Sequence, residues 1–138
     1  MYSTEQDILK RIRKREFDKL VESISGEPIS DDILSEAIST ADSIIDGYLK
    51  NVVKTLPLTE PPEVITDCSA TIAIYILHSR IQYHDIPAFW KERYDAAVSY
   101  LRDVSKGLAN LETTIAEADM QESIAAYYNI NVFNREGY

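Results

Sequence analysis

The stretch that decides the fold is ILSEAISTADSIIDGYLKNV, residues 33–52. Its apolar residues recur at steps of three and four positions, and they are Ile33, Leu34, Ala37, Ile38, Ala41, Ile44, Ile45, Tyr48, Leu49 and Val52. A helix completes a turn in about 3.6 residues, so this spacing forms one broad apolar stripe. Ser30 can cap the start, and Asp31 and Asp32 suit the positive end of the helix dipole. We predict a long amphipathic helix that begins at Ser30.

Gly47 interrupts this stripe. A glycine in an exposed helix interior costs about 1 kcal/mol relative to alanine. Close packing of a second helix could offset that loss, so we expect a helix crossing at Gly47.

The next segment begins after Pro61-Pro62 and runs to about His84. It is apolar around most of its circumference, through Ile65, Cys68, Ile72, Ala73, Ile74, Ile76 and Leu77. The alternating isoleucines would also suit a buried strand, but no second strand candidate accompanies them. We therefore predict a central helix. A last helix is expected from Pro87, which suits a first helical position, to Gly107, a natural helix stop.

The first 24 residues carry a weaker helical pattern. Ser3 and Gln6 have the spacing of a capping box, and an apolar face follows at Ile8, Leu9 and Ile12. The basic cluster Arg11, Arg13, Lys14 and Arg15 then interrupts the pattern before Phe17 and Leu20 resume it. One bent helix or two short ones fit, and we favour two.

After Gly107 the periodicity weakens further. Thr114 and Glu117 could cap a short helix, whereas residues 129–134 alternate polar and apolar side chains, as an extended arm does. We predict an all-α fold of four to five helices over residues 1–111, with one long helix and one central apolar helix. Residues 112–138 are predicted to form a C-terminal arm, partly helical or extended.

Composition restricts the function. The net charge of −9 argues against tight binding to a phosphate backbone, which needs Lys and Arg. The longest apolar run, residues 70–77, is too short to span a bilayer, and the start is no secretory signal. We expect a cytosolic protein without tight nucleic-acid or membrane binding.

Catalytic and metal-binding patterns are missing from the sequence. His78 and His84 lack metal-ligand spacing, and Cys68 lies on an apolar helix face. No glycine-rich phosphate loop or Gly-x-Ser-x-Gly motif occurs. We expect no enzyme activity, no cofactor and no metal.

Four aromatic residues lie in the arm, which lacks the periodicity to bury them, and we interpret them as candidate partner contacts: Tyr127, Tyr128, Phe133 and Tyr138. The basic cluster has two interpretations, a solvated turn or a contact with an acidic neighbour. Tyr48, Tyr75 and Tyr94 have a spacing compatible with the core.

Two motifs stand out in the sequence. Residues 45–49, Ile-Asp-Gly-Tyr-Leu, end an Ala-rich helix, and the Leu-Pro-Leu turn at residues 56–58 follows. Both resemble motifs of the Mu-like prophage head-to-tail joining (connector) family. Glu92-Arg93-Tyr94, Lys106-Gly107 and residues 132–135 are also similar to that family. The chain departs from it at Lys54-Thr55, where relatives carry an Arg-Tyr pair. We interpret Gly47, Tyr48, Pro57 and Gly107 as turn or packing positions.

The resemblance implies a non-catalytic connector that joins portal and tail, contacts neighbouring subunits and forms a homo-oligomeric ring on assembly. It would occupy the bacterial host cytoplasm before assembly and the head-tail junction of the virion afterwards. Its acidic surface would let DNA pass through a conduit without sticking. The alternative is a small helical protein-binding module or accessory subunit unrelated to virion assembly, which would expose a groove near the helix of Trp90.

Overall fold

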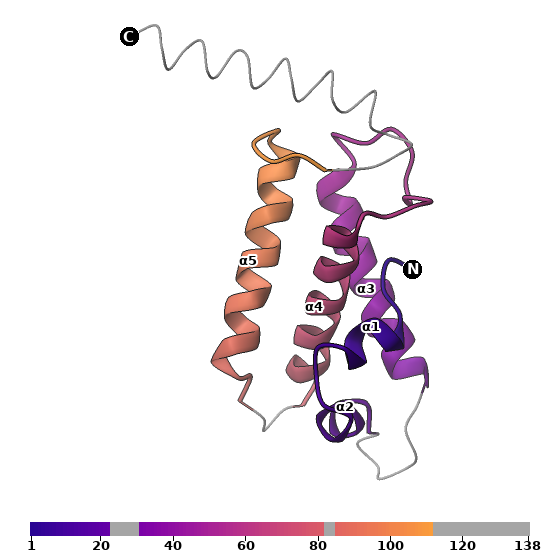
Figure 1. The fold of residues 1–138 in the computed structure, drawn as a ribbon, viewed down its shortest axis with the longest axis vertical. Helices are drawn as coiled ribbons and strands as arrows, with labels where there is room; N and C mark the ends of the chain where they lie inside the picture. Colours follow the sequence, from indigo (N-terminus) through magenta and orange to yellow (C-terminus); the bar gives the residue numbers. More distant parts are fainter. Residues whose placement is uncertain (23–30, 82–84, 112–138) are drawn as a thin grey trace, which may run out of the picture.

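Five α-helices make up the part of the chain that the computed structural model describes, residues 1–22, 31–81 and 85–111. They are α1 (Glu5–Leu9), α2 (Lys14–Val21), α3 (Asp31–Leu49), α4 (Glu63–Ser79) and α5 (Ala88–Ser105). No strand occurs in these ranges, so the predicted all-α class is confirmed. The long helices α3, α4 and α5 run alternately up and down, with α4 beside both of the others (Figure 1).

Helix α4 is the centre of the fold, as its composition predicts. Ten of its 17 residues are buried, and it contacts each of the other four helices. Ile72, Ile74 and Leu77 have no exposed surface at all. Complete burial of such side chains stabilises a fold by roughly 1.5–3 kcal/mol each, so α4 contributes strongly to the shared core.

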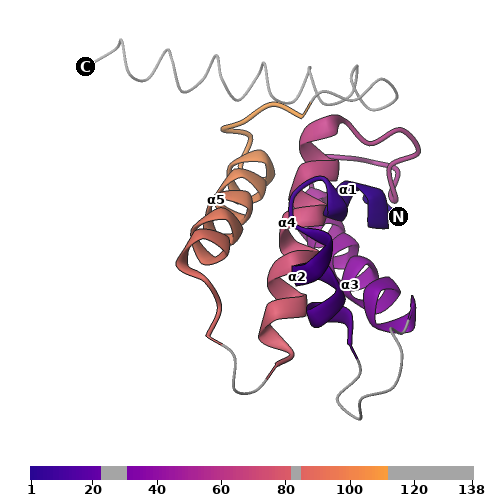
Figure 2. The ribbon, with the colours of Figure 1, turned by 60° about the horizontal axis from the view of Figure 1, so that its bottom comes forward.

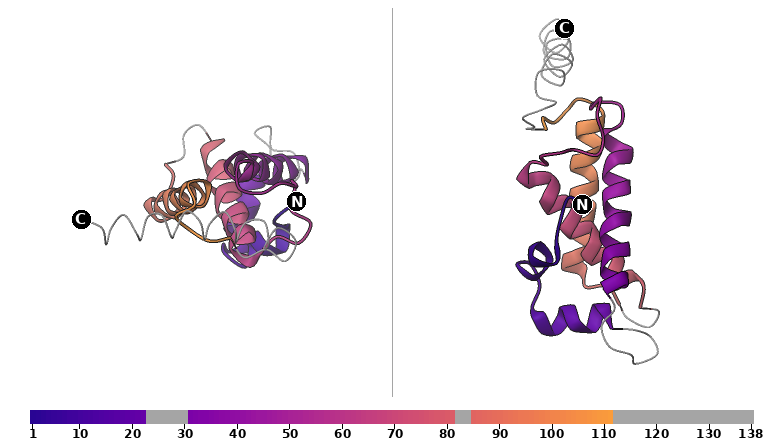
Figure 3. Two further views of the ribbon diagram at one scale, coloured as in Figure 1. Left: turned by 90° about the horizontal axis from the view of Figure 1, so that it is seen from above. Right: turned by 90° about the vertical axis from the view of Figure 1, so that its right-hand side faces the viewer.

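The N-terminal segment forms two short helices, as favoured from the sequence. Figures 1 and 2 show α1 lying against α4, and α2 crosses the lower end of α3 in the right-hand view of Figure 3. The predicted capping box of Ser3 and Gln6 is wrong by one residue. Thr4 is the cap, and its hydroxyl accepts from the amide of Asp7 while the Asp7 carboxylate accepts from the amide of Thr4.

Ser3 is unavailable as a cap because it is buried against α4, where its hydroxyl lies 2.7 Å from that of Ser69. Tertiary packing therefore decides between two adjacent hydroxyl residues, although serine is the slightly better cap of the two.

Two helix ends differ from the predicted ones. Helix α3 ends at Leu49 rather than near Val52, and α4 ends at Ser79, before the predicted His84. Directly after α4, the Arg80 guanidinium donates to the carbonyl oxygens of Leu20 at 2.6 Å and Glu22 at 3.0 Å. It thus satisfies backbone acceptors that the end of α2 leaves without helical partners. Ser30 and His84 lie outside the described residues.

Gly107 has the position and conformation expected of a helix stop. Its φ is 76°, and its amide donates to the carbonyl of Val104 at 3.0 Å. The amide of Leu108 donates to the carbonyl of Asp103 at 2.8 Å. This pair of bonds is the Schellman motif, in which a left-handed glycine satisfies the last carbonyls of a helix.

None of the helices in the described ranges combines the length and the apolar character that a membrane crossing requires.

Candidate functional site

A buried polar network ties the N-terminal segment to α3. The Tyr2 hydroxyl donates to the Asp46 carboxylate, and it accepts from the amide of Leu58 at 2.9 Å. Tyr2 is only 4% exposed. Burial raises the pKa of Tyr2 well above its ordinary value, and the hydrogen bond to Asp46 raises that pKa further. The phenol is therefore a neutral structural group.

Asp42, one helical turn before Asp46, extends this network. Its carboxylate accepts from the amide of Tyr2 at 3.0 Å and from the Ser69 hydroxyl at 2.7 Å. Ser3 completes the set through Ser69. We call Tyr2, Ser3, Asp42, Asp46 and Ser69 the N-terminal network, which joins α3, α4 and the chain start.

This network connects two motifs that the sequence singles out. Asp46 belongs to the Ile-Asp-Gly-Tyr-Leu motif, and Leu58 belongs to the Leu-Pro-Leu turn. Tyr2 bridges them with one hydroxyl group. Sequence reasoning missed this role, because only the fold brings residue 2 within reach of positions 44 and 56 residues further along the chain.

The crossing expected at Gly47 is wrong. A methyl group placed there would meet nothing within 4 Å outside its own helix, so no second helix packs closely at this point. Gly47 is exposed because it lies on the solvent side of α3, between the half-buried Asp46 and Tyr48. Pro57, in the loop after α3, is exposed and follows a cis peptide bond.

Tyr48 packs at the edge of the core and belongs to a group of three tyrosines. Tyr75 of α4 and Tyr94 of α5 stack with ring centroids 4.0 Å apart. Burial raises the pKa of Tyr94, and the nearby Tyr75 and Tyr48 raise it further. The stacked rings of Tyr75 and Tyr94 thus link α4 and α5, and the half-buried Tyr48 of α3 lies near Tyr94.

The basic cluster divides into inward and outward members. The Arg11 guanidinium lies 2.9 Å from the Asp67 carboxylate and fixes the chain after α1 to α4. Lys14 pairs with Asp18 at 3.0 Å within α2. Arg13 and Arg15 are exposed and have no carboxylate within ion-pair distance in the described ranges. The four residues of the basic cluster therefore do not form one continuous basic patch.

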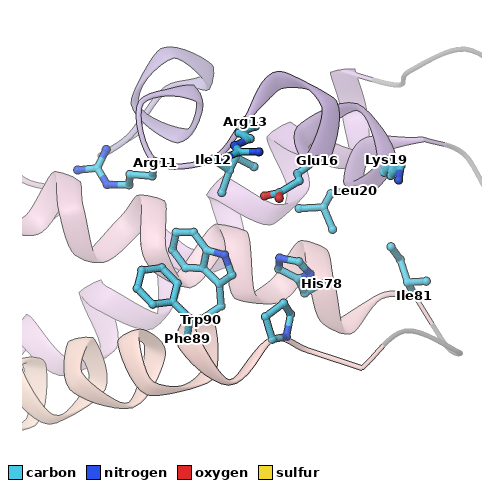
Figure 4. Close-up of a pocket in the computed structure, with 11 residues that line it drawn as sticks. Arg11, Ile12, Arg13, Glu16, Lys19, Leu20, His78, Ile81, Phe89 and Trp90 are labelled. Atoms are coloured by element: carbon cyan, nitrogen blue, oxygen red, sulfur yellow. The ribbon is translucent and has the colours of Figure 1, made fainter.

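A groove lies between α2 and the start of α5. Its volume is about 810 Å³, and its lining includes Ile12, Arg13, Glu16, Lys19, Leu20, His78, Phe89 and Trp90. We call it the α2–α5 groove. Phe89 and Trp90 lie side by side in the close-up, both facing the chain between α1 and α2 (Figure 4). The groove stands where the alternative interpretation of the sequence expects one, near the helix of Trp90.

The aromatic edge of the α2–α5 groove carries an additional cation. Phe89 is 57% exposed and packs edge-to-face on the buried Trp90, with ring centroids 5.2 Å apart. The Arg93 guanidinium lies 5.2 Å from the Phe89 ring centre and 5.7 Å from that of Trp90. A large exposed aromatic beside a cation is typical of protein interfaces.

Cys68 lies in the core, as predicted, with 3% of its surface exposed. Burial raises the pKa of its thiol to about 12, and the neighbouring Asp67 raises it too. The thiol is therefore protonated at neutral pH and unsuited to nucleophilic attack. In the described part of the chain, no three His, Cys, Asp or Glu side chains gather where they could hold a metal ion.

The four aromatic residues of the predicted arm, Tyr127, Tyr128, Phe133 and Tyr138, lie outside the described residues.

The chain matches a protein-family model. The family model described as "Bacteriophage Mu, Gp36" matches residues 2–128. No curated protein matches the chain.

Proposed function

Because the chain belongs to the bacteriophage Mu Gp36 family, we propose that this phage protein is a non-catalytic structural component that joins the capsid portal to the tail. The observation that carries the proposal is the match over residues 2–128, which covers nearly the whole chain. The resemblance of residues 45–49 and 56–58 to head-to-tail joining proteins supplies the more specific role.

The fold supports a structural role. The polar side chains of the N-terminal network bond with one another and with backbone groups, and the Cys68 thiol is protonated. The α2–α5 groove presents an exposed aromatic ring and cations, which suit protein contacts. We propose that the protein stays in the host cytoplasm until portal and tail assemble, and then forms a ring between them.

The acidic balance suits a conduit for DNA. A surface of net charge −9 repels a polyanion, whereas walls rich in Lys and Arg would bind phosphates. Fluorescence anisotropy with labelled duplex DNA at physiological salt should show no tight binding. Tight, salt-resistant binding would overturn the conduit proposal.

The test of the joining role is removal of the gene from an inducible phage element that carries it. Electron microscopy of the induced lysate should then show DNA-filled heads and separate tails, with joining restored by the unmodified gene supplied in trans. Complete particles in the deletion strain would contradict the proposal. Light scattering of the purified protein mixed with the portal should further show a complex that contains several copies.

A second candidate is a small helical protein-binding module unrelated to virion assembly. The α2–α5 groove favours it, because an exposed Phe89 beside Trp90 is an apolar docking edge. The gene deletion separates the two candidates: particle assembly proceeds normally if the groove serves a partner outside the virion.

A further inference from the structure

The α2–α5 groove combines an apolar floor with a positive rim. Ile12 and Leu20 are buried on one side, and Trp90 is buried on the other, with the exposed Phe89 at the mouth. Such a floor accepts aromatic or aliphatic side chains, and a volume of about 810 Å³ is in the range of sites that hold several side chains.

The cations at the rim differ in how far they are engaged. Arg11 already pairs with Asp67. Arg13 and Lys19 are exposed and have no carboxylate within ion-pair distance among the described residues. Glu16 adds one negative charge to the lining. The occupant that fits best is therefore acidic and carries aromatic side chains.

One segment of this chain has that chemistry. Residues 112–138 contain five acidic residues and one basic residue, and they include the four aromatics of the predicted arm. The three acids Glu117, Asp119 and Glu122 lie close together, shortly before Tyr127 and Tyr128. Charge and side-chain type thus complement the rim and the floor of the groove.

We propose that residues 112–138 of one copy bind in the α2–α5 groove of a neighbouring copy. This inference rests on the proposed function, because it supplies the contact that builds the ring. Strand addition, the other way in which an arm could dock, needs a sheet edge, and residues 1–22, 31–81 and 85–111 contain no strand.

The placement of the groove is compatible with a contact between copies. Phe89 and Trp90 lie in the first turn of α5, whereas the chain leaves this helix at its other end, after Ser105, and continues toward the C-terminus (Figure 1). Eighteen helical residues separate these ends by roughly 27 Å. Donor and acceptor at opposite ends make a head-to-tail contact, which closes into a ring when the rotation between copies allows it.

The experiment is a charge swap in the full chain. One variant reverses the rim with Arg13→Glu and Lys19→Glu, and the other reverses the arm with Glu117→Lys, Asp119→Lys and Glu122→Lys. Light scattering should show that the unmodified protein exceeds its monomer mass of 15.7 kDa as its concentration rises. Each variant alone should stay at 15.7 kDa, with association weakened about tenfold or more.

Mixing the two variants should restore association, because each reversed group then meets a complementary one on the other chain. Trp90 is the single tryptophan, so its fluorescence should shift only in samples that associate. A control with Lys91→Glu and Arg102→Glu, both exposed on α5 and outside the groove, should associate like the unmodified protein.

Three results would overturn the proposal. They are a mixture that stays at 15.7 kDa, a variant that still associates fully by itself, and a single chain carrying both reversals that regains the Trp90 signal as a monomer. The last result would mean that the arm binds its own groove. Each would leave the joining role intact, because that role is judged by the gene deletion.

Discussion

Two aromatic residues, Tyr2 and Phe89, occupy opposite situations in this molecule. Tyr2 is 4% exposed, and its hydroxyl has both a donor and an acceptor within the chain. Phe89 is 57% exposed at the mouth of the α2–α5 groove, where a guanidinium is its cationic neighbour. The first aromatic completes the fold, whereas the second leaves apolar surface for another molecule.

This difference in burial and hydrogen bonding distinguishes residues that stabilise the fold from residues that are available to bind a partner. In the N-terminal network, removing one group leaves a buried partner without its hydrogen bond, which lowers the free energy of unfolding. At the mouth of the groove, removing the exposed Phe89 side chain leaves no buried polar group unsatisfied, so stability should change little while binding is lost. Four variants test this contrast, and they follow in order of the expected effect.

The largest effect is expected at α4, which supports both regions. Ile72 is fully buried, so Ile72→Ala should lower the free energy of unfolding by about 3 kcal/mol through lost burial and a cavity. Chemical denaturation measures it, and Ile72→Val, expected at about 1 kcal/mol, is the matched control. Equal effects of the two variants would show that the site collapses around the smaller side chain.

The N-terminal network should show the next largest effect. Tyr2→Phe keeps the ring but deprives Asp46 of its donor and Leu58 of its acceptor, so a loss of about 2 kcal/mol is expected. Tyr100→Phe deletes the same atom from a half-buried ring whose hydroxyl donates to the carbonyl of Asn110 in an exposed hydrogen bond. It should cost less than about 0.5 kcal/mol. Similar losses of the free energy of unfolding in the two variants would show that the hydrogen bonds of Tyr2 contribute no more than that of Tyr100.

The start of α1 should show a smaller effect that depends on pH. Desolvation would raise the pKa of Asp7, but the hydrogen bonds from Thr4 outweigh it, and the pKa lies below its ordinary 3.8. Because folding lowers the pKa of Asp7, its ionised carboxylate stabilises the fold fully at pH values above 3.8. This contribution is lost as the pH falls from 3.8 through the lowered pKa of the folded protein.

Thr4→Ala should therefore cost about 1 kcal/mol at neutral pH, and the difference from the unmodified protein should shrink as the pH falls below 3.8. Denaturation curves at several pH values measure both quantities. A difference that does not change with pH would mean that Thr4 acts independently of Asp7.

The sequence predicts the helices well, because each long helix carries its own periodic pattern and its own stop. Gly107 and Pro87 bound α5 near the expected residues, and α4 is central as its composition indicates. The errors are tertiary in origin. Burial of Ser3 moves the cap to Thr4, and Gly47 faces solvent although its position in the apolar pattern predicted a crossing.

The interaction residues were harder to predict. The basic cluster is contiguous in sequence, but folding turns Arg11 toward Asp67 and leaves Arg13 exposed at a groove. The contribution of Tyr2 depends on contacts 40 and 44 residues away, which no local pattern encodes. A groove near the helix of Trp90 was predicted only under the alternative interpretation of the sequence. Its second wall is α2, and the helical pattern of the sequence does not show that α2 lies beside the start of α5.

The smallest effect on stability is expected at Phe89, at the mouth of the α2–α5 groove. Phe89→Ser removes an exposed ring that packs on Trp90 and Arg93, so the free energy of unfolding should change by about 0.5 kcal/mol or less. Association in light scattering should nevertheless fall as strongly as with the rim reversal, because Phe89 forms the apolar mouth of the groove. A variant that unfolds more easily but still associates would identify Phe89 as a packing residue. The aromatic edge would then belong to the fold, as Tyr2 does.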